Sequence, residues 1–134
     1  MLSARFRTAV EQGNHESLPE LFREDAVFRS PVLFKPYEGR DQVLKVLQAA
    51  EKVLTAEGRF RYVAQLENGD ERVAMLEFAT EVDGKQVEGI DKLTFDEDGL
   101  ISELKVLLRP ASGLQVVAEA MAAEFERLGL GLPA

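Results

Sequence analysis

The sequence predicts an α+β domain in which helices pack on one face of a curved, mainly antiparallel sheet. Apolar residues recur at helical spacing up to about residue 58 and at every second position from residue 59 onward. Three turn dipeptides, Asn68-Gly69, Asp83-Gly84 and Asp98-Gly99, follow one another at regular intervals in the second half. A length of 134 residues, with 46% hydrophobic and 30% charged residues, suits one domain over residues 1–134 without repeats or linkers.

Two helices are expected before residue 23. Gly13-Asn14 ends the first helix, which is predicted by the apolar stripe Leu2, Phe6, Ala9 and Val10. The tetrapeptide Ser17-Leu18-Pro19-Glu20 has the pattern of a capping box with proline in the first turn. It therefore predicts a second, short helix that continues through Leu21 and Phe22.

A strand and a third helix are expected next. The strand runs from Ala26 to Ser30 and is ended by Pro31, and Pro36 and Gly39 lie in the loop that follows. The third helix ends near Gly58, and its inner stripe consists of Val43, Leu47, Ala50 and Leu54.

The second half predicts an antiparallel meander followed by a last helix. Three turns of the type found in β-hairpins join four expected strands, at residues 59–67, 71–82, 86–96 and 100–109. We interpret Asp96-Glu97-Asp98 as part of the third turn, because it lacks the spaced ligands of a calcium loop. Pro110 ends the meander, and Ser112 is expected to cap a helix that stops at Gly129. The apolar stripe of this helix is Leu114, Val117, Met121, Phe125 and Leu128.

Composition excludes several classes of function. The 24 acidic residues outnumber the 16 basic ones, and the resulting net charge of −8 disfavours nucleic acid as a partner. No apolar run approaches the roughly 20 residues that cross a bilayer, and the first residues have no apolar core typical of a secretory signal. With no cysteine and a single histidine, neither a metal nor another cofactor is expected. We therefore expect a cytoplasmic protein without a membrane partner.

The strand around Asp91 is the most informative segment for function. Asp91 is in phase with the more apolar set of side chains, Val87, Gly89, Leu93 and Phe95. A carboxyl group on a core face must be hydrogen-bonded, paired or protonated through a raised pKa. Asp91 is thus a candidate binding or catalytic acid, and the alternative is an architectural acid paired with a lysine, arginine or tyrosine.

Other side chains are weaker candidates. Ser30 is in phase with Phe28 and could face the interior, although a serine before proline often only satisfies a backbone group. Tyr37 could overhang a pocket mouth or serve as a packing residue. His15 lies in a polar turn and is expected to be exposed to solvent. The remaining candidates for the core or the pocket wall are Phe6, Phe22, Phe28, Tyr62, Met75, Phe78 and Leu93.

The order of these motifs resembles the nuclear transport factor 2-like superfamily, which includes SnoaL-like polyketide cyclases and ketosteroid isomerases. The resemblance extends from residue 2 to about residue 109. It is carried by Gly13-Asn14, by residues 26–31, by Tyr37-Glu38-Gly39-Arg40 and by residues 89–101. It implies a cone-shaped fold, in which a strongly bent sheet wraps around helices and encloses one deep apolar pocket.

The resemblance also assigns positions to the groups of a ketosteroid isomerase, which uses an Asp base and an oxyanion hole of Tyr and protonated Asp. Asp91 matches the protonated Asp, whereas the base falls on Ser30 and the Tyr falls on Phe6. One of three groups is therefore retained, and ketosteroid isomerisation by that mechanism is not expected. Asp91 itself is expected to have a pKa above the usual value of about 3.9.

Three functional hypotheses follow. The first is a protein that binds a small apolar ligand in a deep pocket anchored by Asp91. The second is an isomerase, cyclase or hydratase that acts on a lipophilic substrate with Asp91 as acid or base. The third is a protein-interaction module. We also expect a homodimer through the outer sheet face, on the assumption that Leu104, Val106 and Leu108 lie on that face.

Overall fold

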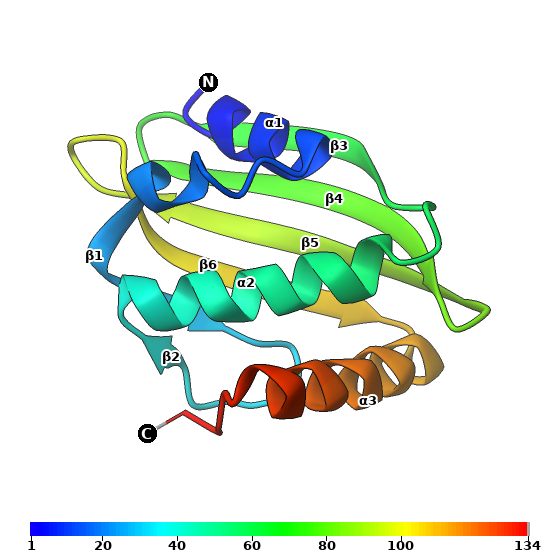
Figure 1. Ribbon diagram of the computed structural model, residues 1–134. Helices are drawn as coiled ribbons and strands as arrows, with labels where there is room; N and C mark the ends of the chain where they lie inside the picture. Colours follow the sequence, from blue (N-terminus) through cyan, green and yellow to red (C-terminus); the bar gives the residue numbers. More distant parts are fainter. Residues whose placement is uncertain (134) are drawn as a thin grey trace.

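In the computed structural model, which describes residues 1–133, the change of periodicity at residue 59 marks the start of four consecutive strands of the sheet. Helices α1 (Ala4–Gln12), α2 (Arg40–Thr55) and α3 (Ala111–Leu128) lie on the concave side of a curved sheet (Figure 1). The described strands are β1 (Phe22–Arg29), β2 (Tyr37–Glu38), β3 (Arg61–Asn68), β4 (Val73–Val82), β5 (Lys85–Phe95) and β6 (Ile101–Arg109). The α+β prediction is confirmed.

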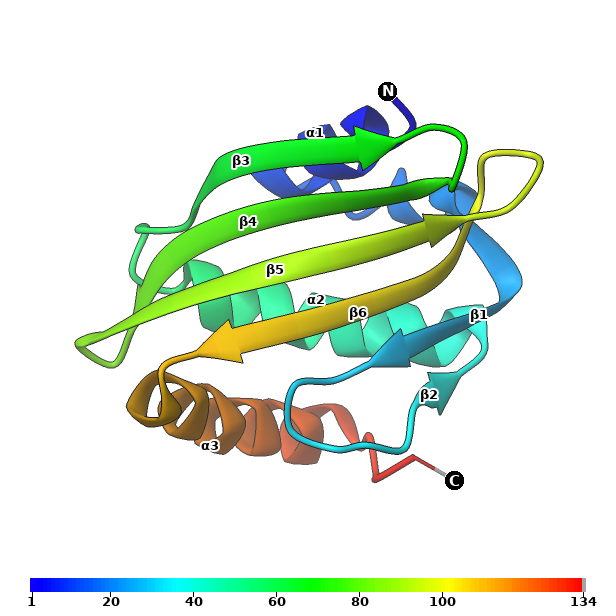
Figure 2. The same ribbon diagram turned by 180° about the vertical axis from the view of Figure 1, so that it is seen from behind.

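The predicted meander forms the greater part of the sheet. Strands β3, β4, β5 and β6 pair antiparallel in sequence order, with bounds within two residues of those expected. Strand β1 lies beside β6 and runs parallel to it, so that Phe28 is opposite Leu104. The full order is β2-β1-β6-β5-β4-β3, and the sheet is seen from its uncovered outer side in Figure 2.

Four local predictions need correction. The short helix is a 3₁₀ turn from Leu18 to Leu21, and the Ser17 hydroxyl donates to the Asn14 carbonyl instead of capping it. Strand β1 begins at Phe22 rather than Ala26, because an irregularity between Phe22 and Val27 breaks its alternation. Strand β2, where only a loop was expected, pairs with β1. Ser112 lies inside α3, whose N-cap is Pro110.

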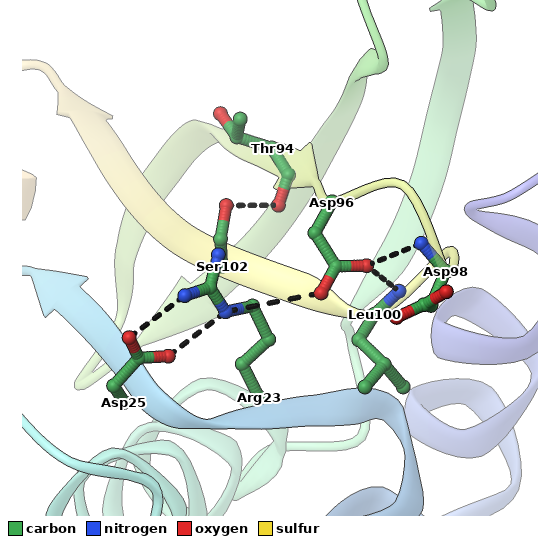
Figure 3. A network of polar contacts seen from close by, with 7 residues as sticks. All are labelled: Arg23, Asp25, Thr94, Asp96, Asp98, Leu100 and Ser102. Carbon is green, nitrogen blue, oxygen red and sulfur yellow. Dashed lines mark hydrogen bonds and ion pairs between the residues drawn. The ribbon is translucent and has the colours of Figure 1, made fainter.

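The turn between β5 and β6 is built on Asp96. One Asp96 oxygen, Oδ1, accepts hydrogen bonds of 2.9 Å from the backbone amides of Asp98 and Leu100 (Figure 3). Arg23 at the start of β1 donates to Asp25 at 2.7 and 2.8 Å, and its Nε lies 3.8 Å from Asp96 Oδ2. The predicted hairpin turn is confirmed, and its aspartate is engaged by backbone and arginine groups.

The main core fills the space between the concave sheet face and α1 and α2. Phe6 of α1 meets Phe22 edge to face, with ring centroids 6.4 Å apart. A smaller cluster beneath α3 contains Val82, Val87 and Val117. Helix α2 contributes the buried residues Val43, Val46, Leu47, Ala49 and Val53. No helix within residues 1–133 is long and apolar enough to cross a membrane.

Candidate functional site

A cavity of about 200 Å³ is lined by side chains of α2, of α3 and of the concave face of the sheet. Its wall is predominantly apolar, with side chains from both helices and from β1, β3 and β6. The half-exposed Val32, in the loop after β1, and the exposed Leu132, in the C-terminal segment, line its outer end. Polar side chains in the wall are few, and they include Ser30, Tyr37, Glu51, Tyr62 and Asp91.

Asp91 is placed in the cavity wall by the alternation of β5. It pairs with Leu76 of β4 and Val106 of β6, both of which are buried on the concave face. The Tyr62 hydroxyl donates a 2.9 Å hydrogen bond to Asp91 Oδ2. Burial raises the pKa of Asp91 from 3.8 to about 7, although the hydrogen bond from Tyr62 acts in the opposite direction. The predicted direction of the shift is confirmed: the neutral form of Asp91 persists to a higher pH than that of an ordinary aspartic acid.

Tyr62 is held in place by aromatic and cationic neighbours. Its ring meets Phe60 edge to face at 5.1 Å, and the Arg7 guanidinium lies 5.5 Å from its centroid. Burial, together with the nearby Asp91 carboxylate, raises the pKa of the Tyr62 phenol. The phenol therefore remains a hydrogen-bond donor throughout the physiological pH range.

Glu51 is a second acid in the cavity wall, and its place there was not predicted from the sequence. Its side chain is 11% exposed, and its Oε2 lies 3.1 Å from Nδ1 of His15. Its Oε1 is buried without a hydrogen-bond partner among the described residues. Burial raises the pKa of Glu51 to about 7. The available signal was its position: Glu51 is four residues after Leu47 and three before Leu54, within the apolar stripe of α2.

His15 lies in the predicted turn after α1 and is exposed, as expected. The pairing with Glu51 was not expected, because 36 residues separate the two in sequence. His15 and Glu51 also line a second, more polar hollow on the outside of the helices, near the C-terminal end of α3. Glu51 thus lies in the wall between the inner cavity and this outer hollow.

The structure brings several predicted candidates to the cavity in structural roles. Phe6 and Phe28 contribute to its apolar wall. The Ser30 hydroxyl oxygen accepts hydrogen bonds from the backbone amides of Val32 and Leu33, at 3.1 and 2.9 Å. This is the structural role left open for a serine before proline.

Tyr37 connects β2 to the C-terminal segment. Its hydroxyl donates to the Gly131 carbonyl at 3.3 Å, and its ring meets Phe125 edge to face at 6.0 Å. Burial raises the pKa of the phenol. Tyr37 is therefore a packing residue of the cavity wall, one of the two roles considered for it.

Four expected pocket residues lie elsewhere. Phe22, Phe78 and Leu93 are buried in the core without lining the cavity. Phe78 packs against Gly89, where an added Cβ would lie 2.4 Å from Phe78 Cζ. Met75 is 40% exposed on the outer sheet face, because residues of β4 alternate and Phe78 faces inward.

The assumption behind the expected dimer surface is also corrected. Leu104 and Val106 are buried on the concave side, and Leu108 lines the cavity. The outward-facing apolar residue of β6 is Leu107, which is 49% exposed. It follows Val106 directly, and consecutive strand residues point to opposite faces.

The chemistry available in the cavity is that of two carboxyl groups and a phenol. Among residues 1–133 no group of three or more His, Asp or Glu side chains is arranged to hold a metal ion. A neutral carboxyl group and a phenol can donate hydrogen bonds to a ligand oxygen, and a carboxylate can accept a proton. The apolar wall strengthens these interactions by excluding water.

Comparison with known families identifies a match over most of the chain. A model of the SnoaL-like domain family matches residues 3–104. No curated protein matches the chain. The steroid delta-isomerase of Pseudomonas aeruginosa is 35% identical, with a TM-score of 0.88, and the match covers 95% of this chain and 90% of that one.

Further solved structures share the fold. A conserved bacterial protein with a cystatin-like fold from Silicibacter pomeroyi is 30% identical, with a TM-score of 0.84; the match covers 93% of this chain and 85% of that one. A candidate SnoaL-like polyketide cyclase from Shewanella putrefaciens is 13% identical, with a TM-score of 0.62 and coverage of 91% and 84%. The resemblance stated from the sequence motifs is confirmed by these matches.

Proposed function

The chain belongs to the SnoaL-like domain family, and from this premise we propose that it binds a small lipophilic molecule that carries a carbonyl or hydroxyl oxygen. The observation that carries the proposal is the buried hydrogen bond between Tyr62 and Asp91 in an otherwise apolar cavity wall. The apolar lining matches the body of such a molecule, and burial of that body provides most of the binding free energy.

Asp91 supplies the oxygen recognition. Because Tyr62 donates to Oδ2, the proton of a neutral Asp91 is free to be donated to the ligand from Oδ1. With a pKa of about 7, Asp91 offers this proton at and below neutral pH, whereas the carboxylate above that range only accepts. The site therefore favours a ketone, an enol or an alcohol over an anion.

An isomerase, cyclase or hydratase is the second candidate function. It is supported by the 35% identity to a protein that is itself a steroid delta-isomerase. At the positions that match the base and the oxyanion-hole tyrosine of a ketosteroid isomerase, however, this chain has Ser30 and Phe6. Ser30 is engaged by backbone amides and Phe6 has no polar group, so this chain requires a different base.

We also propose a homodimer through the outer sheet face, in place of the general interaction module considered from the sequence. The face is uncovered in the structure (Figure 2), and two of its register pairs are apolar. These pairs are Leu66 with Met75 and Ile90 with Leu107. Association would bury this apolar surface and leave the cavity side of each subunit free.

Titration calorimetry tests the binding proposal with two ligands of nearly the same shape. They are 2-tetralone, a bicyclic ketone, and tetralin, the corresponding hydrocarbon. We expect the ketone to bind more tightly, and Asp91→Leu to remove about 3- to 10-fold of this preference. Asp91→Asn retains a hydrogen-bond donor and should therefore keep part of the preference for the ketone. Asp70→Asn, in the exposed turn before β4, serves as the control. Equal affinities for ketone and hydrocarbon in the unaltered protein would contradict the proposal.

A further inference from the structure

Glu51 is a largely buried acid, with a side chain that is 11% exposed, and the proposed binding function does not use it. It lines the same cavity as Asp91 and Tyr62 but comes from α2, on the helical side. One of its oxygens lies 3.1 Å from Nδ1 of His15, and the other is buried without a hydrogen-bond partner among the described residues. A buried carboxyl oxygen without a partner is costly unless it is protonated or has a functional role.

The other basic side chains near Glu51 are paired with a different acid, which leaves His15 as its neighbour on the solvent side. In the outer hollow, Lys52 of α2 and Arg127 of α3 also lie near Glu51, but both form ion pairs with Glu124, at 3.2 and 2.9 Å. Across the cavity, Asp91 and Tyr62 on the sheet are the ionisable groups that interact with it. Glu51 therefore has the imidazole of His15 beside it on the solvent side and Asp91 on the cavity side.

We propose that Glu51 is the general base of the cavity and that His15 positions it and connects it to solvent. This inference rests on the proposed binding of an oxygen-bearing lipophilic ligand, and it adds the proton acceptor that Ser30 cannot provide. His15 is 53% exposed, so its ring can exchange protons with water while Glu51 remains in the wall.

The proposed step is an enolisation. The Glu51 carboxylate takes a proton from the carbon next to the ligand carbonyl, and the electron pair of that C–H bond forms a carbon–carbon double bond. The carbonyl π electrons move to oxygen, where neutral Asp91 donates a hydrogen bond and Tyr62 orients Asp91. In heavy water the proton on Glu51 exchanges for a deuteron through His15, and transfer of that deuteron to the same carbon gives isotope exchange. Return to a more distant carbon of a conjugated enol gives isomerisation, with no cofactor consumed.

The raised pKa values of Asp91 and Glu51 fit their proposed roles, in which Asp91 donates a hydrogen bond and Glu51 acts as the base. Asp91 and Glu51 each have a pKa near 7 because of burial, and a negative charge on Glu51 further raises the pKa of Asp91. The state with one proton on the pair is thus favoured near neutral pH. In the active form of that state, the proton lies on Asp91 and Glu51 is ionised. The rate should accordingly pass through a maximum near pH 7 and fall on both sides.

Proton exchange at C1 of 2-tetralone in heavy water, followed by proton NMR, tests the inference. The unaltered protein should accelerate the exchange over buffer alone. Glu51→Gln should reduce the catalysed rate by at least about 100-fold while calorimetry shows an affinity close to that of the unaltered protein. Glu126→Gln, an exposed acid on α3, is the matched control and should change neither quantity.

His15→Gln provides a second variant at an exposed position, where loss of the fold is not a concern. Loss of the imidazole partner should raise the pKa of Glu51, so the acidic limb of the pH–rate profile should move to higher pH. A merely structural role of His15 would leave the profile in place.

The remaining outcomes are distinguishable. If the unaltered protein binds 2-tetralone without accelerating exchange, or if Glu51→Gln exchanges at the unaltered rate, Glu51 is not the base. Equal losses of affinity and rate in Glu51→Gln would make Glu51 a structural residue and overturn the inference. If 2-tetralone does not bind, the proposed ligand class is wrong, and the inference that depends on it fails as well.

Discussion

The hydroxyl of Tyr62 lies 2.9 Å from Oδ2 of Asp91 and donates a hydrogen bond to it across the concave face of the sheet. The two residues are on β3 and β5, which are separated by β4. The hydrogen bond favours the charged form of Asp91, whereas burial favours the neutral form, and burial has the larger effect on the pKa. This balance decides whether Asp91 donates or accepts a hydrogen bond near neutral pH.

Tyr62→Phe is predicted to raise the pKa of Asp91 further. The substitution removes the hydroxyl that stabilises the carboxylate, while the ring continues to exclude water. Carboxyl NMR titration of Asp91 measures the effect. Tyr37→Phe is the control, since the Tyr37 hydroxyl donates to the Gly131 carbonyl and should leave the Asp91 titration unchanged. A lower pKa for Asp91 in Tyr62→Phe would contradict the assigned role of the hydrogen bond.

The free energy of unfolding is predicted to fall as the pH rises from about 5 to about 8. Asp91 and Glu51 have raised pKa values in the folded protein, so the folded state keeps protons that the unfolded chain has already released. Their stabilising contribution is fully present below the unfolded pKa values and is lost as pH rises through about 7. For Asp91 alone the loss is roughly 2–4 kcal/mol. Urea unfolding at a series of pH values measures it.

Asp91→Asn should reduce this pH dependence to the part contributed by Glu51, because an amide does not titrate. Glu67 and Glu124 do not interfere, since their pKa values are lowered and their contributions are lost only at more acidic pH. A pH dependence between pH 5 and 8 that is identical in Asp91→Asn and the unaltered protein would show that Asp91 is not the responsible group.

Gly89→Ala is predicted to destabilise the fold by about 1–3 kcal/mol. The new Cβ would lie 2.4 Å from Phe78 Cζ and 2.7 Å from the backbone oxygen of Leu107, and the backbone oxygen cannot move without disturbing β6. Urea unfolding measures the loss. Gly69→Ala is the matched control, because no atom lies within 4 Å of its added Cβ. Equal stability of Gly89→Ala and the unaltered protein would mean that Phe78 packs less closely than the structure indicates.

Leu107→Glu is predicted to convert the proposed homodimer to a monomer. The substitution places a charge among the apolar side chains of the outer sheet face, where burial in an interface would require its desolvation. Sedimentation at micromolar concentration distinguishes the two states. Phe34→Glu, in the exposed loop between β1 and β2, should leave the dimer intact. Sedimentation of the unaltered protein as a 14.9 kDa species alone would refute the dimer.

The sequence determined most of the fold because its signals are local. The three turn dipeptides separated the four meander strands, and alternation along β5 placed Asp91 on the buried face. Once Asp91 was known to face an apolar interior, the direction of its pKa shift followed from desolvation. Local signals failed at β1, where an irregular alternation concealed the first four residues of the strand.

Only the tertiary structure decided how these elements combine into a site. Nothing local could place β1 beside β6, or show that Met75 faces outward while Phe78 faces Gly89. The pairing of His15 with Glu51 likewise depends on how the turn after α1 meets the last turns of α2. Alternation and helical spacing assign a side chain to a face of its own element. Which side chains meet across a cavity is set by the packing of elements distant in sequence, and for Glu51 that packing decided both its burial and its partner.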